Sequence, residues 1–259
     1  MRYRLTIEYA GTKYSGWQIQ QNARTVQGEL QQAAAQAFGK PVEIQGSGRT
    51  DAGVHALGQV AHLDAPGDLP PETLRRRIND ELPADINVLA AVKATPRFHA
   101  RHDAVARSYI YQIARRRTAF AKPFVWWVKD PLDVERMRGA AGAYVGFHDF
   151  RSFTDDDPDQ KSTQVQVDGL EIFEDEDLLV VHMEGSHFLW KMVRRIVGIL
   201  VEVGCGAMPH AAAERLLHEP SPVVAKLTAP ASGLFLERVF YPDDLRDTPV
   251  RAAVRVGRG

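Results

Sequence analysis

The chain has 259 residues, of which 44% are hydrophobic and 25% are charged, and it contains 20 glycines and 15 prolines. This composition is typical of a folded globular protein and excludes disordered, collagen-like and fibrous classes. The formal net charge is −1, but residues 1–117 hold 16 Lys and Arg against 11 Asp and Glu, whereas residues 118–259 hold 16 against 22, so only the first part is suited to binding a polyanion.

The first hundred residues have hydrophobic patterns that predict the element order β-α-β-β-α-β. Alternation from Tyr3 to Tyr9 indicates the first strand, and Thr25 is a suitable N-cap for the first helix. The expected strands cover 2–9, 42–45, 54–63 and 86–92, and the expected helices cover 26–38 and 70–82. This order is that of the ferredoxin-like plan, in which an antiparallel sheet carries two helices on one face.

The second part of the chain shows a similar order with an insertion. Strands are expected over 104–114, 164–173, 178–184 and 234–241, and helices over 132–144, 188–203 and, as the insertion, 210–218. No linker composition separates the two parts. We therefore predict an α+β fold of two ferredoxin-like, RRM-like units, residues 1–100 and 101–259, whose antiparallel sheets join into one core.

The cellular setting is indicated by cysteine usage and hydropathy. The single cysteine, Cys205, excludes an intrachain disulfide and a thiolate zinc site. The nine histidines lack the spacing of a metal site, so we expect no metal. No stretch approaches the roughly 18 apolar residues of a membrane span, and no secretory signal opens the sequence. We expect a cytoplasmic protein without membrane association.

The segment 46–55, with the sequence GSGRTDAGVH, gathers reactive side chains beside three glycines. One interpretation is a hairpin connection in which Arg49 and Asp51 face solvent. The other is an active loop, in which the glycines let a substrate backbone approach and Arg49 keeps the carboxylate of Asp51 ionised, as a nucleophile or base requires. The residues of the loop alone leave both interpretations open.

The loop sequence from Gly46 to Val60 is similar to the signature loop of the tRNA pseudouridine synthase A family. Six further segments resemble that family in the same order along the chain: YAGTKYSGWQ at 9–18, FHAR at 98–101, RSYIY at 107–111, HDF at 148–150, FLWKMVRRIVG at 188–198 and APASGLFL at 229–236. The resemblance implies the pseudouridine-synthase core with a central cleft. It also implies an isomerase, free of cofactors, that converts uridine to pseudouridine in the tRNA anticodon stem-loop at positions 38, 39 and 40.

The resemblance further implies roles for single residues. Asp51 is then the catalytic aspartate, which either bonds to the sugar or base or removes the 2′ proton, and Arg194 holds it charged. Tyr109 stacks on the target uracil and is placed to remove its C5 proton. Arg49 takes the space of the flipped nucleotide, and Leu234 closes the pocket over the base.

The resemblance also nominates positions for RNA docking, all in the first part of the chain. The candidates are Phe98, His99, Ala100, Arg101 and His102, together with Arg75, Arg76 and Arg77. On charge alone the arginine run is a solvated face. The acidic loop at 155–161 departs from the family pattern and argues against RNA contact there. The family also implies a homodimer with tRNA as its partner.

Two other functions fit parts of the sequence. A non-catalytic, RRM-like RNA-binding protein would share the element order, although no aromatic RNP-type strand motif is present. A carboxylate glycosidase acting on a nucleoside would also use Asp51, but it needs a second positioned acid and would release free uracil.

Overall fold

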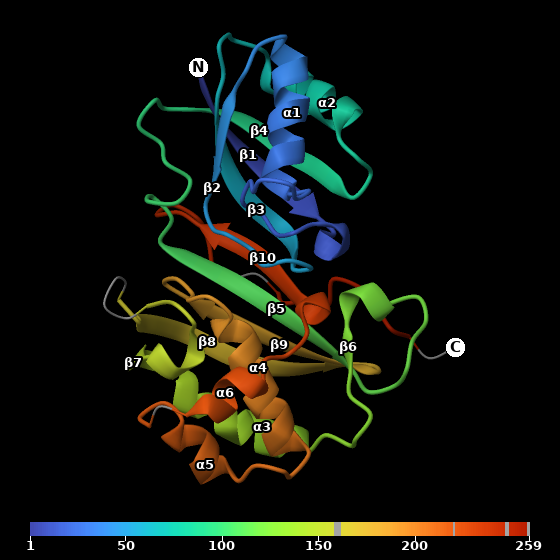
Figure 1. The fold of residues 1–259 in the computed structure, drawn as a ribbon, viewed down its shortest axis with the longest axis vertical. Helices are drawn as coiled ribbons and strands as arrows, with labels where there is room; N and C mark the ends of the chain where they lie inside the picture. The colour runs from blue at the N-terminus through green and yellow to red at the C-terminus, as the bar shows by residue number, and fades with distance from the viewer. Residues whose placement is uncertain (158–161, 220, 247–248, 258–259) are drawn as a thin grey trace. The chain divides into compact units, whose positions relative to one another are not determined.

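The computed structural model describes residues 1–157, 162–219, 221–246 and 249–257. The chain divides into two compact units (Figure 1). The first contains residues 1–105 and 235–246, and the second contains residues 106–234 and the described residues after 248. Residues 235–246 belong to the first unit because a late strand pairs there, whereas the sequence predicted a simple division near residue 100.

The first unit is a mixed sheet with two helices on one face (Figure 1). Its elements are β1 (Arg2–Tyr9), α1 (Val26–Phe38), β2 (Glu43–Gly46), β3 (His55–Asp64), α2 (Pro71–Glu81), β4 (Ile86–Ala94) and β10 (Leu234–Phe240), with a short 3-10 helix at Gly11–Lys13. β1 lies between β4 and β3 and is antiparallel to both. β3 pairs in antiparallel fashion with β2 at Asp64 and in parallel fashion with β10 at His55. The predicted order β-α-β-β-α-β of the first hundred residues is the observed one.

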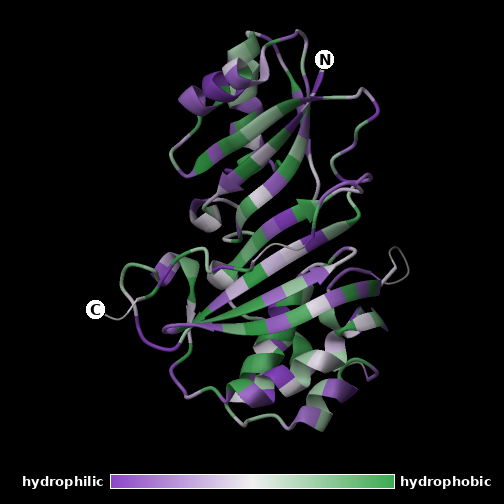
Figure 2. Cartoon of the chain, turned by 180° about the vertical axis from the view of Figure 1, so that it is seen from behind, coloured by the Kyte–Doolittle hydropathy of each residue, from purple (hydrophilic) through white to green (hydrophobic). Residues whose placement is uncertain are grey.

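Local chemistry explains these elements. In β1 the alternate residues from Tyr3 to Tyr9 are buried, and Figure 2 shows such alternation as bands along the strands. The Thr25 hydroxyl accepts a hydrogen bond from the Gly28 N–H at 3.3 Å and caps α1. The helix ends at Gly39, whose φ of 64° is left-handed.

The second unit is a largely antiparallel sheet covered by helices. Its elements are β5 (Ala106–Ala114), β6 (Trp126–Trp127), α3 (Val134–Ala141), β7 (Gly146–Asp149), β8 (Gln164–Asp175), β9 (Leu178–Gly185), α4 (Met192–Gly204), α5 (His210–Arg215) and α6 (Pro222–Lys226). Short 3-10 helices lie at Lys122–Phe124, Gly142–Tyr144, Arg151–Phe153 and Ala231–Gly233. The strand order is β5-β9-β8-β7, all antiparallel, and β6 pairs in parallel with the end of β5.

The second unit differs from its predicted order. β6, β7 and α6 are additional elements, and β10 pairs in parallel with β3 of the first unit. The description as two ferredoxin-like units is therefore not confirmed. The apolar helix begins at Met192 and not at Phe188, because Lys191 has a φ of 63°, which a helical residue cannot adopt. None of the helices in the described residues has the length and apolar character of a membrane span.

Candidate active site

The loop that carries Asp51 connects β2 to β3 and is tied to β3 at its start. The Ser47 N–H donates to the Val60 carbonyl at 2.7 Å, and the side-chain amide of Gln59 donates to the Gly48 carbonyl at 3.0 Å. The loop is thus a hairpin connection by topology. This does not decide between the two interpretations of the sequence, because the connection also leaves Arg49 exposed and Asp51 half-buried.

A second segment, residues 9–18, fixes the residue immediately before Asp51. The Trp17 N–H donates to the Thr50 carbonyl at 3.0 Å, and the Tyr9 hydroxyl shares a hydrogen bond of 2.8 Å with the Thr50 hydroxyl. Gly16 makes this approach possible, since its φ is +92° and a Cβ there would lie 2.5 Å from the Thr50 carbonyl oxygen. Two segments that the sequence singled out separately therefore form one structure.

The far end of the loop is fixed in the same way. The Val54 N–H donates to the Asp51 carbonyl at 3.1 Å, and the Gly11 N–H donates to Nδ1 of His55 at 3.0 Å. A Cβ on Gly11 would lie 1.9 Å from the Val54 carbonyl oxygen, so this contact requires glycine. The backbone on both sides of Asp51 is thereby held by the N-terminal segment.

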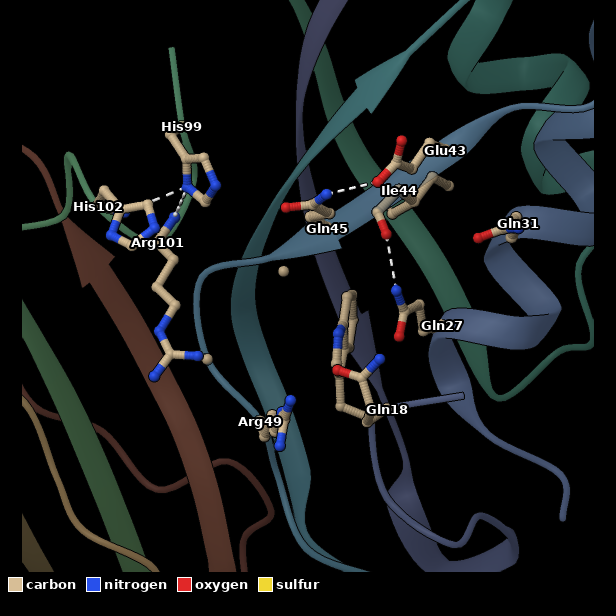
Figure 3. A pocket seen from close by; sticks show the side chains of 13 residues that line it. Gln18, Gln27, Gln31, Glu43, Ile44, Gln45, Arg49, His99, Arg101 and His102 are labelled. Atoms are coloured by element: carbon tan, nitrogen blue, oxygen red, sulfur yellow. Dashed lines mark hydrogen bonds between the residues drawn. The ribbon is translucent and has the colours of Figure 1, made fainter. Parts of the chain in front are cut away.

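A pocket of about 490 Å³ lies beside Arg49 within the first unit (Figure 3). Figure 3 shows the His99–His102 segment on one side, a group of glutamine side chains on the other, and Arg49 low between them. The lining residues are Trp17, Gln18, Gln27, Gln31, Glu43, Ile44, Gln45, Gly46, Gly48, Arg49, His99, Arg101 and His102. Four residues predicted to meet RNA thus line one pocket.

Hydrogen bonds to the rings of His62 and His99 fix the segment 99–102. Nδ1 of His99 accepts hydrogen bonds from the N–H groups of Arg101 at 3.2 Å and His102 at 3.3 Å, and Nδ1 of His62 accepts one from the Ala100 N–H at 3.2 Å. Burial lowers the pKa of both His62 and His99, with nearby positive groups adding to the effect. Both rings are therefore neutral at pH 7 and carry their proton on Nε2.

The other predicted docking residues lie outside this pocket. The Phe98 ring packs on Tyr241 at 5.3 Å, and the Tyr241 hydroxyl donates to the buried Ala100 carbonyl at 2.7 Å. The arginine run lies on α2, where Arg75 and Arg76 pair with Glu72 at 2.7 and 3.1 Å. The Arg77 guanidinium donates to the Ala37 carbonyl at 3.4 Å.

Tyr109, Arg194 and Leu234 belong to the second unit. Tyr109 lies on β5 opposite Met183, and its ring meets Phe188 edge-on with the centroids 5.1 Å apart. Arg194 lies in the first turn of α4, and Leu234 is buried at the start of β10. The structure therefore places Tyr109 and Leu234 on strands and Arg194 on a helix.

Arg194 is bound in two directions to the segment that precedes Leu234. Its Nε donates to the Ala229 carbonyl at 2.7 Å, and its own carbonyl accepts the Ala229 N–H at 3.0 Å. The Tyr111 hydroxyl, whose pKa is raised by burial, donates to the Pro230 carbonyl at 2.7 Å and anchors the same segment. The two late motifs of the sequence, 188–198 and 229–236, meet at Arg194.

The described part of the acidic loop contacts α4. Asp155 forms ion pairs with Lys191 at 2.8 Å and with the buried guanidinium of Arg195, and these two cations lower its pKa. The side chain of Asp156 accepts the Trp190 N–H at 3.2 Å. Residues 158–161 of this loop lie outside the described residues. The negative charge of Asp155 is thus paired with cations of the same chain.

The pocket residues Gln18, Gln31, Glu43 and Gln45 were not predicted from the sequence. Composition could have indicated a polar surface here, since eight glutamines occur from position 18 to position 45. The described residues contain no group of three or more His, Cys, Asp or Glu side chains placed to hold a metal ion.

Comparison with known proteins gives consistent matches. A family model described as tRNA pseudouridine synthase matches residues 5–103 and 140–242. Proteins named tRNA pseudouridine synthase A are similar over 93% of this chain: 43% identical over 244 residues in Syntrophotalea carbinolica, covering 97% of that protein, and 40% identical over 247 residues in Limosilactobacillus fermentum, covering 96%. One from Rhodopseudomonas palustris is 41% identical over 243 residues and is covered to 99%.

Proposed function

This chain belongs to the tRNA pseudouridine synthase family, and we propose that it isomerises uridine in the anticodon stem-loop of tRNA, at positions 38, 39 and 40, through the carboxylate of Asp51. Family membership makes it an isomerase that acts on tRNA uridine. The observation that carries the assignment of Asp51 is its loop: the backbone on both sides is held by residues 9–18, and the side chain is half-buried beside the exposed Arg49.

The reaction needs one ionised carboxylate and no external reagent. The bond from N1 of uracil to C1′ breaks, the base rotates, C5 bonds to C1′, and the C5 proton leaves while N1 gains one. Asp51 either bonds covalently to the sugar or base or removes the 2′ proton, and both routes require its charged form. We assign Arg194 as the cation that keeps Asp51 charged, supported by its anchoring at Ala229.

The proposal gives the remaining site residues roles in holding the base. Tyr109 provides a ring surface for the uracil, and its edge contact with Phe188 supports a fixed ring orientation. Leu234 closes the pocket over the base. Arg49 enters the space that the flipped uridine leaves, and its exposure at the loop tip supports that role.

RNA docking is assigned mainly to the segment 98–102. His99, Arg101 and His102 have the support of lining the pocket beside Arg49. Phe98 and Ala100 serve this segment from within, and Arg75, Arg76 and Arg77 offer a more distant phosphate contact, partly offset by Glu72.

We further propose a cytoplasmic homodimer. A reducing compartment agrees with the single cysteine, Cys205. The family resemblance of the sequence, which implies a homodimer, supports the second part of this proposal. Light scattering coupled to gel filtration measures the mass directly, and a monomer at micromolar concentration would contradict the dimer.

Nucleoside analysis of an unmodified tRNA transcript tests the function. After incubation, complete digestion should yield pseudouridine and no free uracil, and mapping on the undigested transcript should place the pseudouridine at positions 38–40. Free uracil would identify a glycosidase instead. Binding of the transcript without any change in its nucleosides would identify an RNA-binding protein.

A further inference from the structure

We propose that the pocket beside Arg49 binds a second nucleotide of the RNA, next to the target uridine, with its base against Gln18, Gln31 and Gln45. The inference rests on the proposed function, because it adds a flanking nucleotide to the substrate that the active site recognises. Arg101 is assigned to the phosphate of the same nucleotide, while Arg49 keeps the role proposed above at the edge of the pocket.

The glutamine side of the pocket can recognise the edge of a base. A side-chain amide offers both a donor and an acceptor, which is the pattern that base edges require. Gln18 and Gln31 make no side-chain hydrogen bond to any other described residue. Gln45 donates to Glu43 at 2.5 Å and keeps its carbonyl oxygen as an acceptor. These three amides are thus open to a ligand.

The wall behind these amides is rigid. The Gln27 amide donates to the Ile44 carbonyl at 2.7 Å and accepts the Ile19 N–H at 3.1 Å, so both of its polar groups are occupied. Trp17 is 1% exposed, and a Cβ on Gly46 would lie 2.6 Å from its ring. A wall with fixed backbone and fixed buried side chains orders the amides before the ligand arrives, which reduces the entropic cost of binding.

The opposite side of the pocket carries positive charge. Arg101 lies across the pocket from Gln18, Gln27 and Gln31 in Figure 3, and Glu43 is the acidic residue of the lining. Guanidinium groups bind phosphate oxygens in pairs of parallel hydrogen bonds. A phosphate alone would leave the amide wall unused, and an apolar ligand would bury polar groups without partners. A nucleotide uses both sides.

Size and position agree with a flanking nucleotide. The volume of about 490 Å³ falls within the range of roughly 300–1,000 Å³ that small-molecule sites occupy. Arg49 is two residues from Asp51, and two residues span at most about 7 Å of chain. The pocket and Asp51 therefore share one short loop, which agrees with a nucleotide that flanks the uridine at Asp51.

Equilibrium binding to synthetic anticodon stem-loops tests the pocket. The double variant Gln18→Ala/Gln45→Ala is expected to bind the unmodified stem-loop about tenfold more weakly, as for the loss of two hydrogen bonds. A series of stem-loops, each with one abasic nucleotide near the target, locates the partner. At one position the wild type and the double variant should bind the abasic RNA equally, because the base that the glutamines recognise is already missing.

Matched controls separate recognition from folding. Gln32→Ala alters an exposed glutamine on α1 outside the pocket and should bind every RNA as the wild type does. Gln31→Ala, a single change at a half-buried helix position, provides a second pocket variant should the double variant unfold. Thermal unfolding of each variant verifies the fold.

Either of two results would overturn the pocket. One is that both pocket variants bind the unmodified stem-loop with wild-type affinity. The other is that the double variant binds every abasic RNA more weakly than the wild type by the same factor. Because the assay measures binding and not turnover, it is independent of Asp51. If nucleoside analysis finds no pseudouridine but the position-specific binding pattern is observed, the proposed chemistry is contradicted and the nucleotide-binding pocket is still supported.

Discussion

The N–H of Trp17 donates to the carbonyl of Thr50 at 3.0 Å, and this bond ties the N-terminal segment to the residue before Asp51. The loop between β2 and β3 is rich in glycine and would be mobile if it were held by its own residues alone. The bonds from residues 9–18 remove that freedom. The geometry of Asp51 therefore depends on residues far from the loop in sequence.

Gly16→Ala should impair the site although the Asp51 side chain itself is unchanged. A Cβ on residue 16 would lie 2.5 Å from the Thr50 carbonyl oxygen and would push residues 9–18 away from the Asp51 loop. The φ of +92° adds backbone strain for alanine. We expect a loss of about 1–3 kcal/mol in the free energy of unfolding and a lower kcat. Urea unfolding and single-turnover kinetics measure both. Gly67→Ala is the control, because a Cβ there has no atom within 4 Å, and equal losses in both variants would contradict this account.

Asp155→Asn should destabilise the second unit. It leaves Arg195, which is 2% exposed, without its counter-charge, and Nε of Arg195 already lacks a hydrogen-bond partner among the described residues. We expect a loss of about 1–3 kcal/mol, below the value for a fully buried pair because the Asp155 side chain is 38% exposed.

Glu135→Gln is the matched control for Asp155→Asn. Glu135 pairs with Arg138 on the surface of α3, so its loss should change the free energy of unfolding by less than about 0.5 kcal/mol. If thermal unfolding shows the two variants to be equally stable, the ion pair of Asp155 contributes nothing measurable.

The neutral His62 should make the first unit sensitive to acid. Its folded pKa lies below its unfolded value because burial penalises the imidazolium and Arg2 adds to the effect. As the pH falls, the imidazole is therefore protonated in the unfolded state before it is protonated in the folded state. The contribution of His62 to the free energy of unfolding is fully present above about pH 6.5 and is lost as the pH drops through the folded pKa. His62→Gln removes this group and should flatten the decline in unfolding free energy from pH 7 to 5. An unchanged decline would assign it to other groups.

Arg194→Lys should lower turnover although it preserves the charge. The Arg194 guanidinium donates from Nε to the Ala229 carbonyl, and in the proposed site its two further nitrogens hold the carboxylate of Asp51. The single ammonium group of lysine cannot make both contacts. We expect kcat to fall roughly 10- to 100-fold, the equivalent of one charged hydrogen bond, with tRNA affinity unchanged. Single-turnover rates at saturating enzyme test this, and a wild-type rate would remove Arg194 from the catalytic set.

Local patterns were sufficient to predict most of the first unit. The alternation in β1 and the Thr25 cap of α1 are properties of neighbouring residues, and the structure places these elements within one or two residues of the prediction. Pairing between distant segments has no such local signature. The parallel register of Phe235 with His55 depends on which sheet edge is open, and the sequence therefore did not place β10.

The candidate site shows the same limit. Arg49 and the segment 99–102 were predicted as separate RNA contacts, but their common pocket is a result of folding. The acidic loop was predicted to avoid RNA because of its negative charge. In the structure, the Asp155 carboxylate of this loop is paired with Lys191 and Arg195. Charge patterns describe what a side chain can attract and do not identify the partner.

The most direct test of the role of Asp51 is tritium release from tRNA that carries 5-tritiated uridine. The wild type and Asp80→Asn, which alters an exposed aspartate on α2, should release tritium as C5 bonds to C1′. Asp51→Asn should release none while binding tRNA within a few fold of the wild-type affinity. Appreciable release by Asp51→Asn would contradict the assignment of Asp51 as the catalytic carboxylate.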